Sequence, residues 1–431
     1  MSDMKGYPLQ RLGELVSGNR GVSYKPEKLK TAIDDNSVVL LRSNNIQSGT
    51  LNFENVQIVP DSLVSDSQIL KKGDIAVCMS NGSRQLVGKS GMLQHEIEYP
   101  LTVGAFCSVF RCQNEDDSEY VRYLFQSQAY QHGIDVALAG SAINNLKNSD
   151  IEAIEVPTAP KKLRKKIAEI LSTIDNQIDA TQALIDKYTA IKQGMMADLF
   201  SRGIDPETKA LRPTFEEAPE LYYKTPLGML PKGWVCAPIK KFVQSAEYGI
   251  STSLNDDSSG IPVLRMNNIQ NNRFNVEDLK FTKDPEAYRL KLSAGDVLYN
   301  RTNSMEHVGK TAIWRGELSE CSFASYLVRI NVNKCELLPE YFSFWMSQES
   351  SQNALRAFAT PAVQQVNINP TNLQRVLMSC PVSLLEQREI VDRIDAADAV
   401  LLREREALLK LNAQKSALMQ DLLTGKVPVP A

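Results

Sequence analysis

The chain has 431 residues and a formal net charge of −3, with 43% hydrophobic and 23% charged residues, which are ordinary values for a folded globular protein. This length allows two or three hydrophobic cores, and the balanced charge excludes a surface that is basic all over. A nucleic-acid binder of this composition would have to gather its Lys and Arg on one face.

The seven cysteines are scattered and form no Cys-x-x-Cys pair, which favours a reducing cytoplasm and argues against a disulfide framework or a structural zinc site. No apolar run follows the N-terminal residues, and no stretch approaches the roughly 18 apolar residues of a membrane span. We therefore expect a cytoplasmic protein without a signal peptide.

Residues 1–156 are predicted to form a globular unit of mixed α/β character. Residues 70–77 have the pattern of a turn that feeds a buried strand, and 119–130 have helical character. Residues 140–148 are polar and predict a loop, and 151–156 predict the last strand of the unit.

Two long helices are predicted, over 162–200 and 387–423, and a shift of 223 positions aligns one with the other without a gap. Because a lone amphipathic helix is marginal in water, we expect the two copies to pair with each other. Lys192 and Lys415 interrupt the apolar seam at the same place in both copies. Such a lysine either sets the register of the pair or lays its stem along the seam with its amine in water. The seam positions are spaced alternately by three and four residues, as in a coiled coil, and are 167, 171, 174, 178, 181, 185, 188, 192, 195 and 199 in the first helix and 390, 394, 397, 401, 404, 408, 411, 415, 418 and 422 in the second.

Residues 204–233 are rich in Pro, Gly and charge and predict a linker. After the linker, the sequence motifs of the first unit recur in the same order; for example, residues 264–270 correspond to residues 41–47. The fold class is therefore predicted to be α+β with an internal repeat. Its predicted segments are a globular unit at 1–156, a helix at 157–203, a linker at 204–233, a second globular unit at 234–382, and a second helix with its tail at 383–431.

Local catalytic motifs are absent from the sequence: no GxSxG, HExxH or GxGxxG occurs. The nearest match to a phosphate-binding loop is Gly88-Lys89-Ser90 with its partner Gly309-Lys310-Thr311. The glycine that should precede each motif is replaced by Ser83 or Ser304, and a strand rather than a helix is predicted to follow. We therefore expect no catalytic site, cofactor or metal in this chain.

Polar, amide-rich and basic loops recur in both units. Arg and Lys suit phosphates and guanine edges, and Asn and Gln suit adenine edges, although a pair such as Asn44-Asn45 before a turn serves equally well as a backbone cap. Loop positions that match between the units favour a shared architectural role, and positions that differ are better candidates for reading a sequence. The candidate DNA-binding residues are Arg42, Asn44, Asn45, Arg84, Gln85, Lys89, Ser141, Asn144 and Asn145 in the first unit, and Arg265, Asn267, Asn268, Arg301, Asn303, Lys310, Gln364 and Gln365 in the second.

Three further strings belong to a recognisable pattern: TPLGMLPKGWV at 225–235, CPVSLLEQREIV at 380–391 and KSALMQDLLTG at 415–425. In this order, and with the repeat, they resemble the specificity subunit of type I restriction–modification enzymes over essentially the whole chain. The first copy departs from the pattern, since APKKLRK at 159–165 lacks the Glu-Gln pair that precedes the second helix.

The resemblance implies that each globular unit is a target recognition domain that reads one half of a bipartite, asymmetric site in double-stranded DNA. It implies that the helices pair antiparallel as a spacer, in a pseudo-two-fold repeat. It also implies a non-catalytic subunit that docks two methyltransferase subunits and two restriction subunits. S-adenosylmethionine, ATP and Mg would be bound by those partners, whose complex is an adenine-N6 DNA methyltransferase and an ATP-dependent endonuclease.

Two alternatives stay open at this point. One is a type IIB-like specificity subunit that serves a fused nuclease–methyltransferase. The other is a coiled-coil adaptor that binds no DNA, which the slightly acidic net charge favours.

Overall fold

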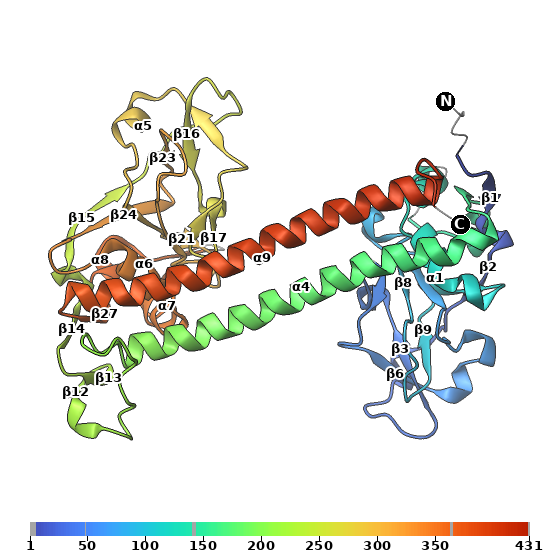
Figure 1. The fold of residues 1–431 in the computed structure, drawn as a ribbon, viewed down its shortest axis with the longest axis horizontal. Helices are drawn as coiled ribbons and strands as arrows, with labels where there is room; N and C mark the ends of the chain where they lie inside the picture. The colour runs from blue at the N-terminus through green and yellow to red at the C-terminus, as the bar shows by residue number, and fades with distance from the viewer. Residues whose placement is uncertain (1–5, 48, 140–143, 363–364, 430–431) are drawn as a thin grey trace. The chain divides into compact units, whose positions relative to one another are not determined.

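The computed structural model describes residues 6–47, 49–139, 144–362 and 365–429 (Figure 1). The chain divides into two compact units, unit 1 being Met1–Ala183 with Arg405–Ala431 and unit 2 being Leu184–Glu404. The boundary passes through both long helices, α4 (Lys161–Ser201) and α9 (Leu384–Thr424). Each unit therefore contains a globular part and one portion of each helix.

Unit 1 is built on a four-stranded antiparallel sheet in the order β2-β10-β7-β8 and a three-stranded sheet in the order β6-β3-β9. In the second sheet β3 pairs antiparallel with β6 and parallel with β9. Hairpin β4-β5 and the pair β1-β11 complete the strands. The elements are β1 (Leu9–Arg11), β2 (Val16–Arg20), β3 (Ser37–Leu41), β4 (Ile46–Gln47), β5 (Thr50–Leu51), β6 (Gln57–Pro60), β7 (Ile75–Cys78), β8 (Ser90–Met92), β9 (Leu101–Val103), β10 (Cys107–Cys112), α1 (Ser118–Leu124), α2 (Gln128–Ala139), α3 (Asn148–Glu152) and β11 (Glu155–Pro157).

The local sequence explains most of these elements. The four residues of β7 are all buried, as its apolar run predicts. The predicted helix at 119–130 is two helices, because Ser127 starts a new one by accepting a hydrogen bond from Tyr130 N at 3.2 Å. The predicted strand at 151–156 is wrong in its first half. Asp150 accepts a hydrogen bond from Lys147 N at 2.7 Å and so starts helix α3, which leaves only Glu155–Pro157 as strand.

Unit 2 repeats this plan. Its sheet β15-β24-β20-β22 corresponds to β2-β10-β7-β8, and β19-β16-β23 corresponds to β6-β3-β9, including the single parallel pair. The predicted α+β class with an internal repeat is thereby confirmed. The elements are β12 (Tyr222–Thr225), β13 (Gly228–Pro231), β14 (Trp234–Pro238), β15 (Val243–Tyr248), β16 (Ile261–Leu264), β17 (Ile269–Gln270), β18 (Arg273–Phe274), β19 (Lys280–Thr282), α5 (Pro285–Arg289), β20 (Val297–Asn300), β21 (Thr302–Asn303), β22 (Thr311–Ile313), β23 (Ser322–Phe323), β24 (Leu327–Val332), α6 (Pro339–Ser347), α7 (Glu349–Arg356), β25 (Thr360–Ala362), β26 (Gln365–Asn367), α8 (Pro370–Leu373) and β27 (Leu377–Pro381).

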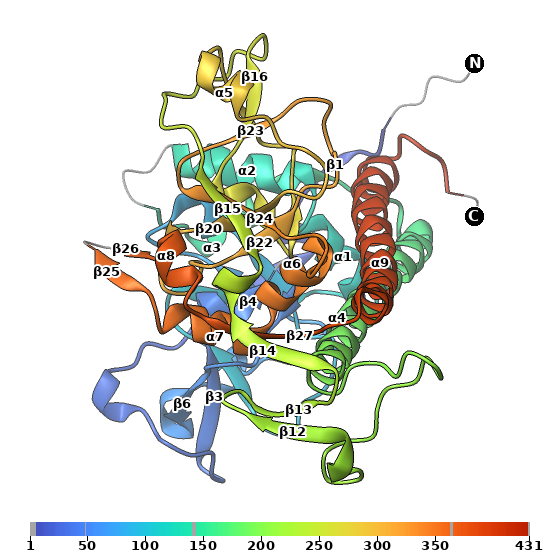
Figure 2. The same ribbon diagram turned by 90° about the vertical axis from the view of Figure 1, so that its left-hand side faces the viewer.

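The segment 204–233, predicted as a linker, contains the hairpin β12-β13 (Figure 2) and contacts the start of α9. Ile204 is fully buried and donates its N–H to Glu386 at 3.1 Å. Glu386, which is 3% exposed, also accepts hydrogen bonds from Arg212 and from Trp234 Nε1 at 2.9 Å. Burial alone would lower the pKa of Arg212, but its hydrogen bonds and proximity to Glu386 raise the pKa overall. The segment is therefore anchored at this end.

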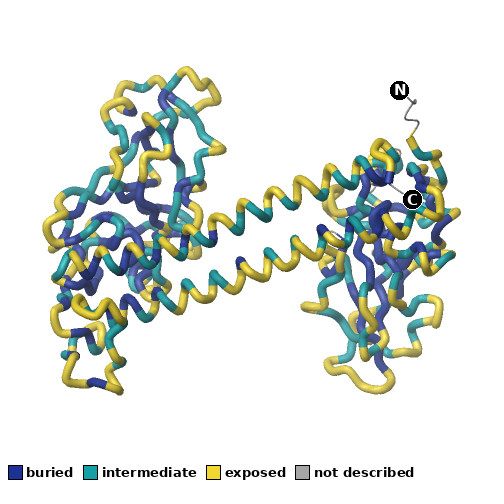
Figure 3. The backbone as a smooth tube through the Cα atoms, viewed as in Figure 1, coloured by how far each residue is buried: buried dark blue, intermediate teal, exposed yellow. Residues whose placement is uncertain are grey.

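In each unit α4 and α9 lie side by side and antiparallel, and their seam residues are buried or half-buried (Figures 1 and 3). In unit 2, Lys192 Nζ lies 2.5 Å from Asp398 Oδ1. In unit 1, Lys415 Nζ lies 2.7 Å from Asp175 Oδ1. Neither seam lysine sends its amine out to water alone; each is paired with an aspartate of the other helix.

Candidate nucleic-acid interface

The turn after β3 shows how the polar loops of unit 1 are built. Asn45 is fully buried; its Oδ1 accepts a hydrogen bond from Arg42 N at 2.9 Å and its Nδ2 donates to Glu54 O at 2.7 Å. Arg42 Nη2 donates to Asn55 O at 3.0 Å. Asn45 therefore serves the turn, because its amide is fully buried and both of its polar atoms are hydrogen-bonded to the backbone. Asn44, its neighbour, is exposed.

The equivalent turn after β16 is built in the same way. Asn268, 2% exposed, accepts a hydrogen bond from Arg265 N at 2.7 Å and donates to Asn275 O and Asp278 O, both at 2.9 Å. Arg265 Nη2 also pairs with Asp278 Oδ2 at 2.9 Å, and Asn267 Nδ2 donates to the same carboxylate at 3.3 Å. Asp278 therefore neutralises part of the charge that the sequence predicted for this loop.

Three loops of unit 1 meet at one surface. Asn81 Nδ2 donates to Ser43 Oγ at 3.3 Å, which joins the 80–86 loop to the first turn. Asn144 Nδ2 donates to Gly82 O at 3.4 Å, and Asn145 forms an antiparallel β-bridge with Ser80. The structure thus brings Arg42, Asn44, Asn144 and Asn145 together.

The other candidates of unit 1 lie around this surface. Arg84 and Gln85 are exposed on a short 3-10 helix (Arg84–Leu86), where Arg84 Nη2 donates to Asp135 O of α2 at 3.3 Å. Lys89 lies at the far end of the loop, directly before β8, and is half-buried. Ser141 lies outside the described residues.

In unit 2 the corresponding loops also converge. Asn303 Nδ2 contacts Met266 Sδ at 3.5 Å, and β21 pairs with β26, which carries Gln365. Arg301 O accepts a hydrogen bond from Ile368 N at 2.8 Å. Lys310 is exposed directly before β22. Gln364 lies outside the described residues.

Sequence reasoning missed Arg20 and two exposed aromatic residues. Arg20, at the end of β2, donates from Nε to Ala105 O at 2.8 Å and from Nη1 to Leu146 O at 3.1 Å. Phe106 is 69% exposed and Tyr326 is 46% exposed. The only sequence signal for these two was their place in the repeat, since each follows the strand that pairs parallel with the one before the Asn-Asn turn.

Beneath the Phe106 turn, Cys78 and Cys107 face each other on β7 and β10, and both are buried. The hydrogen bond between the two thiols lowers the pKa of Cys78 and raises the pKa of Cys107, which burial raises further. Such enclosed thiols pack as small apolar groups.

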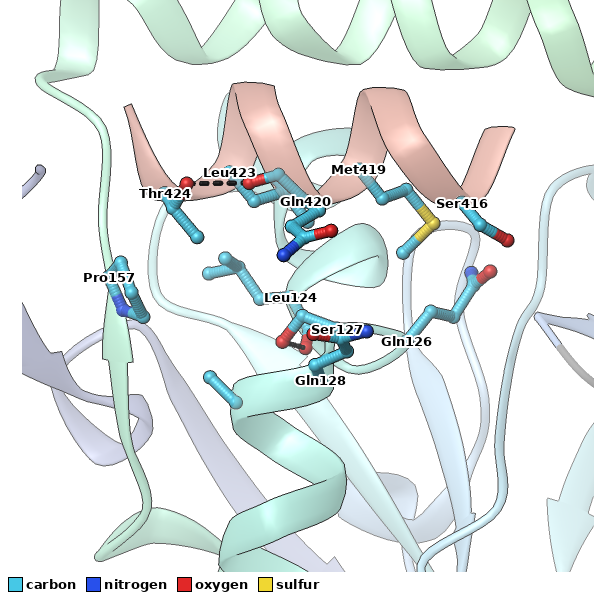
Figure 4. A pocket seen from close by; sticks show the side chains of 11 residues that line it. Leu124, Gln126, Ser127, Gln128, Pro157, Ser416, Met419, Gln420, Leu423 and Thr424 are labelled. Carbon is cyan, nitrogen blue, oxygen red and sulfur yellow. Dashed lines mark hydrogen bonds between the residues drawn. The ribbon is translucent and has the colours of Figure 1, made fainter. Parts of the chain in front are cut away.

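A cavity of about 160 Å³ lies in unit 1 between the end of α9 and helices α1 and α2 (Figure 4). Its walls combine apolar Leu124, Met419 and Leu423 with the amides of Gln126 and Gln420. Its lining residues come from the end of α9 and from the unit against which this helix packs.

In the described parts of the chain, no group of three or more His, Cys, Asp or Glu side chains is placed to hold a metal ion. A search of the same residues finds no helix with the length and apolarity needed to cross a membrane.

Residues 8–189 match the family model of the type I restriction modification DNA specificity domain. The resemblance that the motifs predicted is thereby confirmed: the chain is similar to the specificity subunits of type I restriction–modification enzymes.

The similarity to individual relatives extends along nearly the whole chain. The type I restriction enzyme EcoKI specificity subunit of Escherichia coli strain K12 is 27% identical over 432 residues, covering 98% of this chain and 89% of that protein. The StySPI specificity subunit of Salmonella potsdam is 25% identical over 419 residues, covering 95% of this chain and 86% of that protein.

Solved structures agree in fold. The S subunit of the type I restriction–modification system of M. genitalium aligns with a TM-score of 0.57 at 13% identity, covering 100% of this chain and 98% of that one. A chain from a study of complex assembly and conformational transition of the type I R-M system aligns with a TM-score of 0.50 at 15% identity, covering 98% of each.

Proposed function

We propose that this chain reads DNA sequence for a type I restriction–modification complex. Unit 1 reads one half of a bipartite, asymmetric site, and unit 2 reads the other half. The paired helices α4 and α9, which run through both units, would set the spacing between the half-sites.

One observation carries the proposal: the same loop surface occurs twice in one chain, with a shared framework and different side chains between. The turns that hold Asn45 and Asn268 are equivalent, and Asn81 of unit 1 corresponds to Asn303 of unit 2. The side chains between these equivalent positions differ. Arg20 of unit 1 corresponds to Tyr248 of unit 2, because Arg20 pairs with Ser108 in β10 and Tyr248 pairs with the equivalent residue, Val328, in β24. Two surfaces that read different sequences must share their framework and differ in their contacts.

We further propose that the chain is non-catalytic and acts through partners. Because the two units share one fold, a partner that binds one unit also fits the other. Two methyltransferase and two restriction subunits would therefore bind one chain. S-adenosylmethionine, ATP and Mg would then be held by those partners.

The test is equilibrium binding of the chain, in complex with its methyltransferase subunit, to target and scrambled duplexes over a range of salt. Because each neutralised phosphate adds about −0.9 to the slope of log Kobs against log salt, six to eight contacts predict a slope of about −5 to −7. Lys310→Gln and Arg84→Gln should each make the slope less steep by about one.

Lys224, exposed on the β12 hairpin, supplies the control, and Lys224→Gln should leave the slope unchanged. Binding that shows neither salt dependence nor preference for the target would instead support the coiled-coil adaptor.

A further inference from the structure

Phe106 and Tyr326 occupy the same position in two equivalent turns. In unit 1, Gly104 N donates to Leu41 O at 2.9 Å and Cys107 N donates to Gly104 O at 2.8 Å. In unit 2 the matching bonds are Ala324 N to Leu264 O and Leu327 N to Ala324 O, both at 2.8 Å. The exposed aromatic residue stands just before the residue that closes the turn in each case.

Both turns are held firmly by backbone hydrogen bonds. Phe106 O accepts from Met79 N at 2.8 Å and from Ser80 N at 3.1 Å, and Tyr326 O accepts from Arg301 N at 2.9 Å. The aromatic side chain nevertheless stays outside the core, with 69% of Phe106 and 46% of Tyr326 exposed. Leaving a large apolar ring in water forgoes the free energy that burial would give, so folding alone does not account for a ring kept here twice.

An arginine reinforces each turn, and the two arginines come from different strands. Arg20 Nε of β2 donates to Ala105 O at 2.8 Å, and Arg301 Nε, directly after β20, donates to Ser325 O at 2.8 Å. These carbonyls are equivalent, since each belongs to the residue before the exposed aromatic ring. The arginines are not equivalent, because Tyr248 takes the place of Arg20 in unit 2. The same contact is thus made in two ways, which indicates that the shape of the turn serves the same task in both units.

The surroundings of the two turns suit a nucleobase. In unit 1, Phe106 borders a hollow of about 520 Å³ that is also lined by Tyr24, Arg42 and Asn44. In unit 2, the Arg301 guanidinium lies 5.0 Å from the centre of the half-exposed Tyr248 ring. Cations beside exposed rings match a ligand with phosphates and flat bases.

We propose that Phe106 and Tyr326 are specificity-determining residues whose rings contact the nucleobases of their own half-sites. This inference rests on the proposed function and names the groups that carry it out. Phe106 offers an apolar ring, such as would favour a thymine methyl, and Tyr326 adds a hydroxyl that can hydrogen-bond a base edge.

The experiment uses the full chain in complex with its methyltransferase subunit and measures affinity for a panel of duplexes altered at one base pair at a time. Phe106→Ala should weaken binding by about tenfold to a hundredfold and flatten the preference at a position of the first half-site. Tyr326→Ala should do the same in the second half-site only, so the two variants control each other. Phe106→Tyr should keep most of the affinity.

Phe215→Ala is the control for an exposed aromatic residue elsewhere, since Phe215 is 37% exposed and lies between α4 and β12. This variant should keep the wild-type affinity and base preference. If Phe106→Ala and Tyr326→Ala keep wild-type affinity and base preference, this inference is wrong while the proposed function stands. If the wild-type complex itself shows no sequence preference, the proposed function falls and this inference falls with it.

Discussion

Arg164 and Gln387 occupy equivalent positions at the starts of α4 and α9 and do the same work by different chemistry. Gln387 Oε1 accepts a hydrogen bond from Leu338 N at 2.8 Å, and its Nε2 donates to Pro381 O at 2.8 Å. Arg164 Nη1 instead pairs with Asp117 Oδ2 at 2.7 Å. Asp117 and Leu338 directly precede the matching helices α1 and α6. Each residue therefore ties a long helix to its own unit, and the Glu-Gln pair missing from the first copy is replaced by an ion pair.

Removing either partner of the Arg164–Asp117 ion pair should lower the stability of this junction. The side chains of Arg164 and Asp117 are only 13% and 11% exposed, so Arg164→Ala should leave Asp117 as a poorly solvated charge and destabilise the junction by about 3 kcal/mol. Asp117→Ala should cost a similar amount, and the double variant less than the two together. Hydrogen exchange of residues 118–124 measures the effect. Lys165→Ala, at an exposed neighbour, should change the stability by less than about 0.5 kcal/mol, and an equal effect there would refute the role of Arg164.

Only part of the candidate interface was predictable at this scale. The sequence shows Asn44 and Asn45 as equal candidates, but the turn buries Asn45 and exposes Asn44. The sequence predicts Arg265 and Asn267 as hydrogen-bond donors available to DNA, but in the fold both contact the carboxylate of Asp278. Phe106 could not be distinguished from a core residue, because exposure depends on where a turn points and not on residue type.

At the scale of elements, the seam charges specify how the helices pair. A shift of 223 positions relates Asp175 to Asp398 and Lys192 to Lys415. In the antiparallel arrangement each lysine meets an aspartate. A parallel, in-register pair would place lysine beside lysine and aspartate beside aspartate, and like charges in a partly buried seam repel. The sequence therefore predicted the pairing of the copies from periodicity, whereas the partners of the seam lysines required the structure.

Charge reversal tests this pairing. Lys192→Asp should destabilise unit 2 by about 3 kcal/mol, since it places two carboxylates together where the side chains are 16% and 10% exposed. Asp398→Lys should act in the same direction, and the double reversal should restore most of the loss. Urea unfolding followed by hydrogen exchange of residues 384–404 provides the measurement. Lys187→Asp, on the exposed face of α4, is the matched control. Additive losses in the double variant would show that the ion pair does not set the register.

At the scale of the whole molecule, the chain is an internal duplication, and each of its two units contains part of α4 and part of α9. The sequence predicted the repeat, because apolar periodicity and turn motifs recur in order. The compact units divide within α4 and α9, and the segment ends at 156 and 382 stay predictions. In unit 1 the segment before β1 meets the end of α9, where Tyr7 N donates to Thr424 O at 2.9 Å. Packing of distant segments of this kind leaves no periodic signal in the sequence.

If one chain carries two independent readers of DNA sequence, each globular unit can be exchanged without affecting the other. Replacing residues 1–156 by the corresponding unit of a relative with a different target, while keeping α4 and α9, should therefore change one half of the recognition site and leave the other half and the spacing intact. Single-molecule sequencing of adenine methylation in a host that carries the chimera measures this directly. We expect a methylated motif with one new half-site and one original half-site. A motif in which both halves change, or neither does, would contradict it.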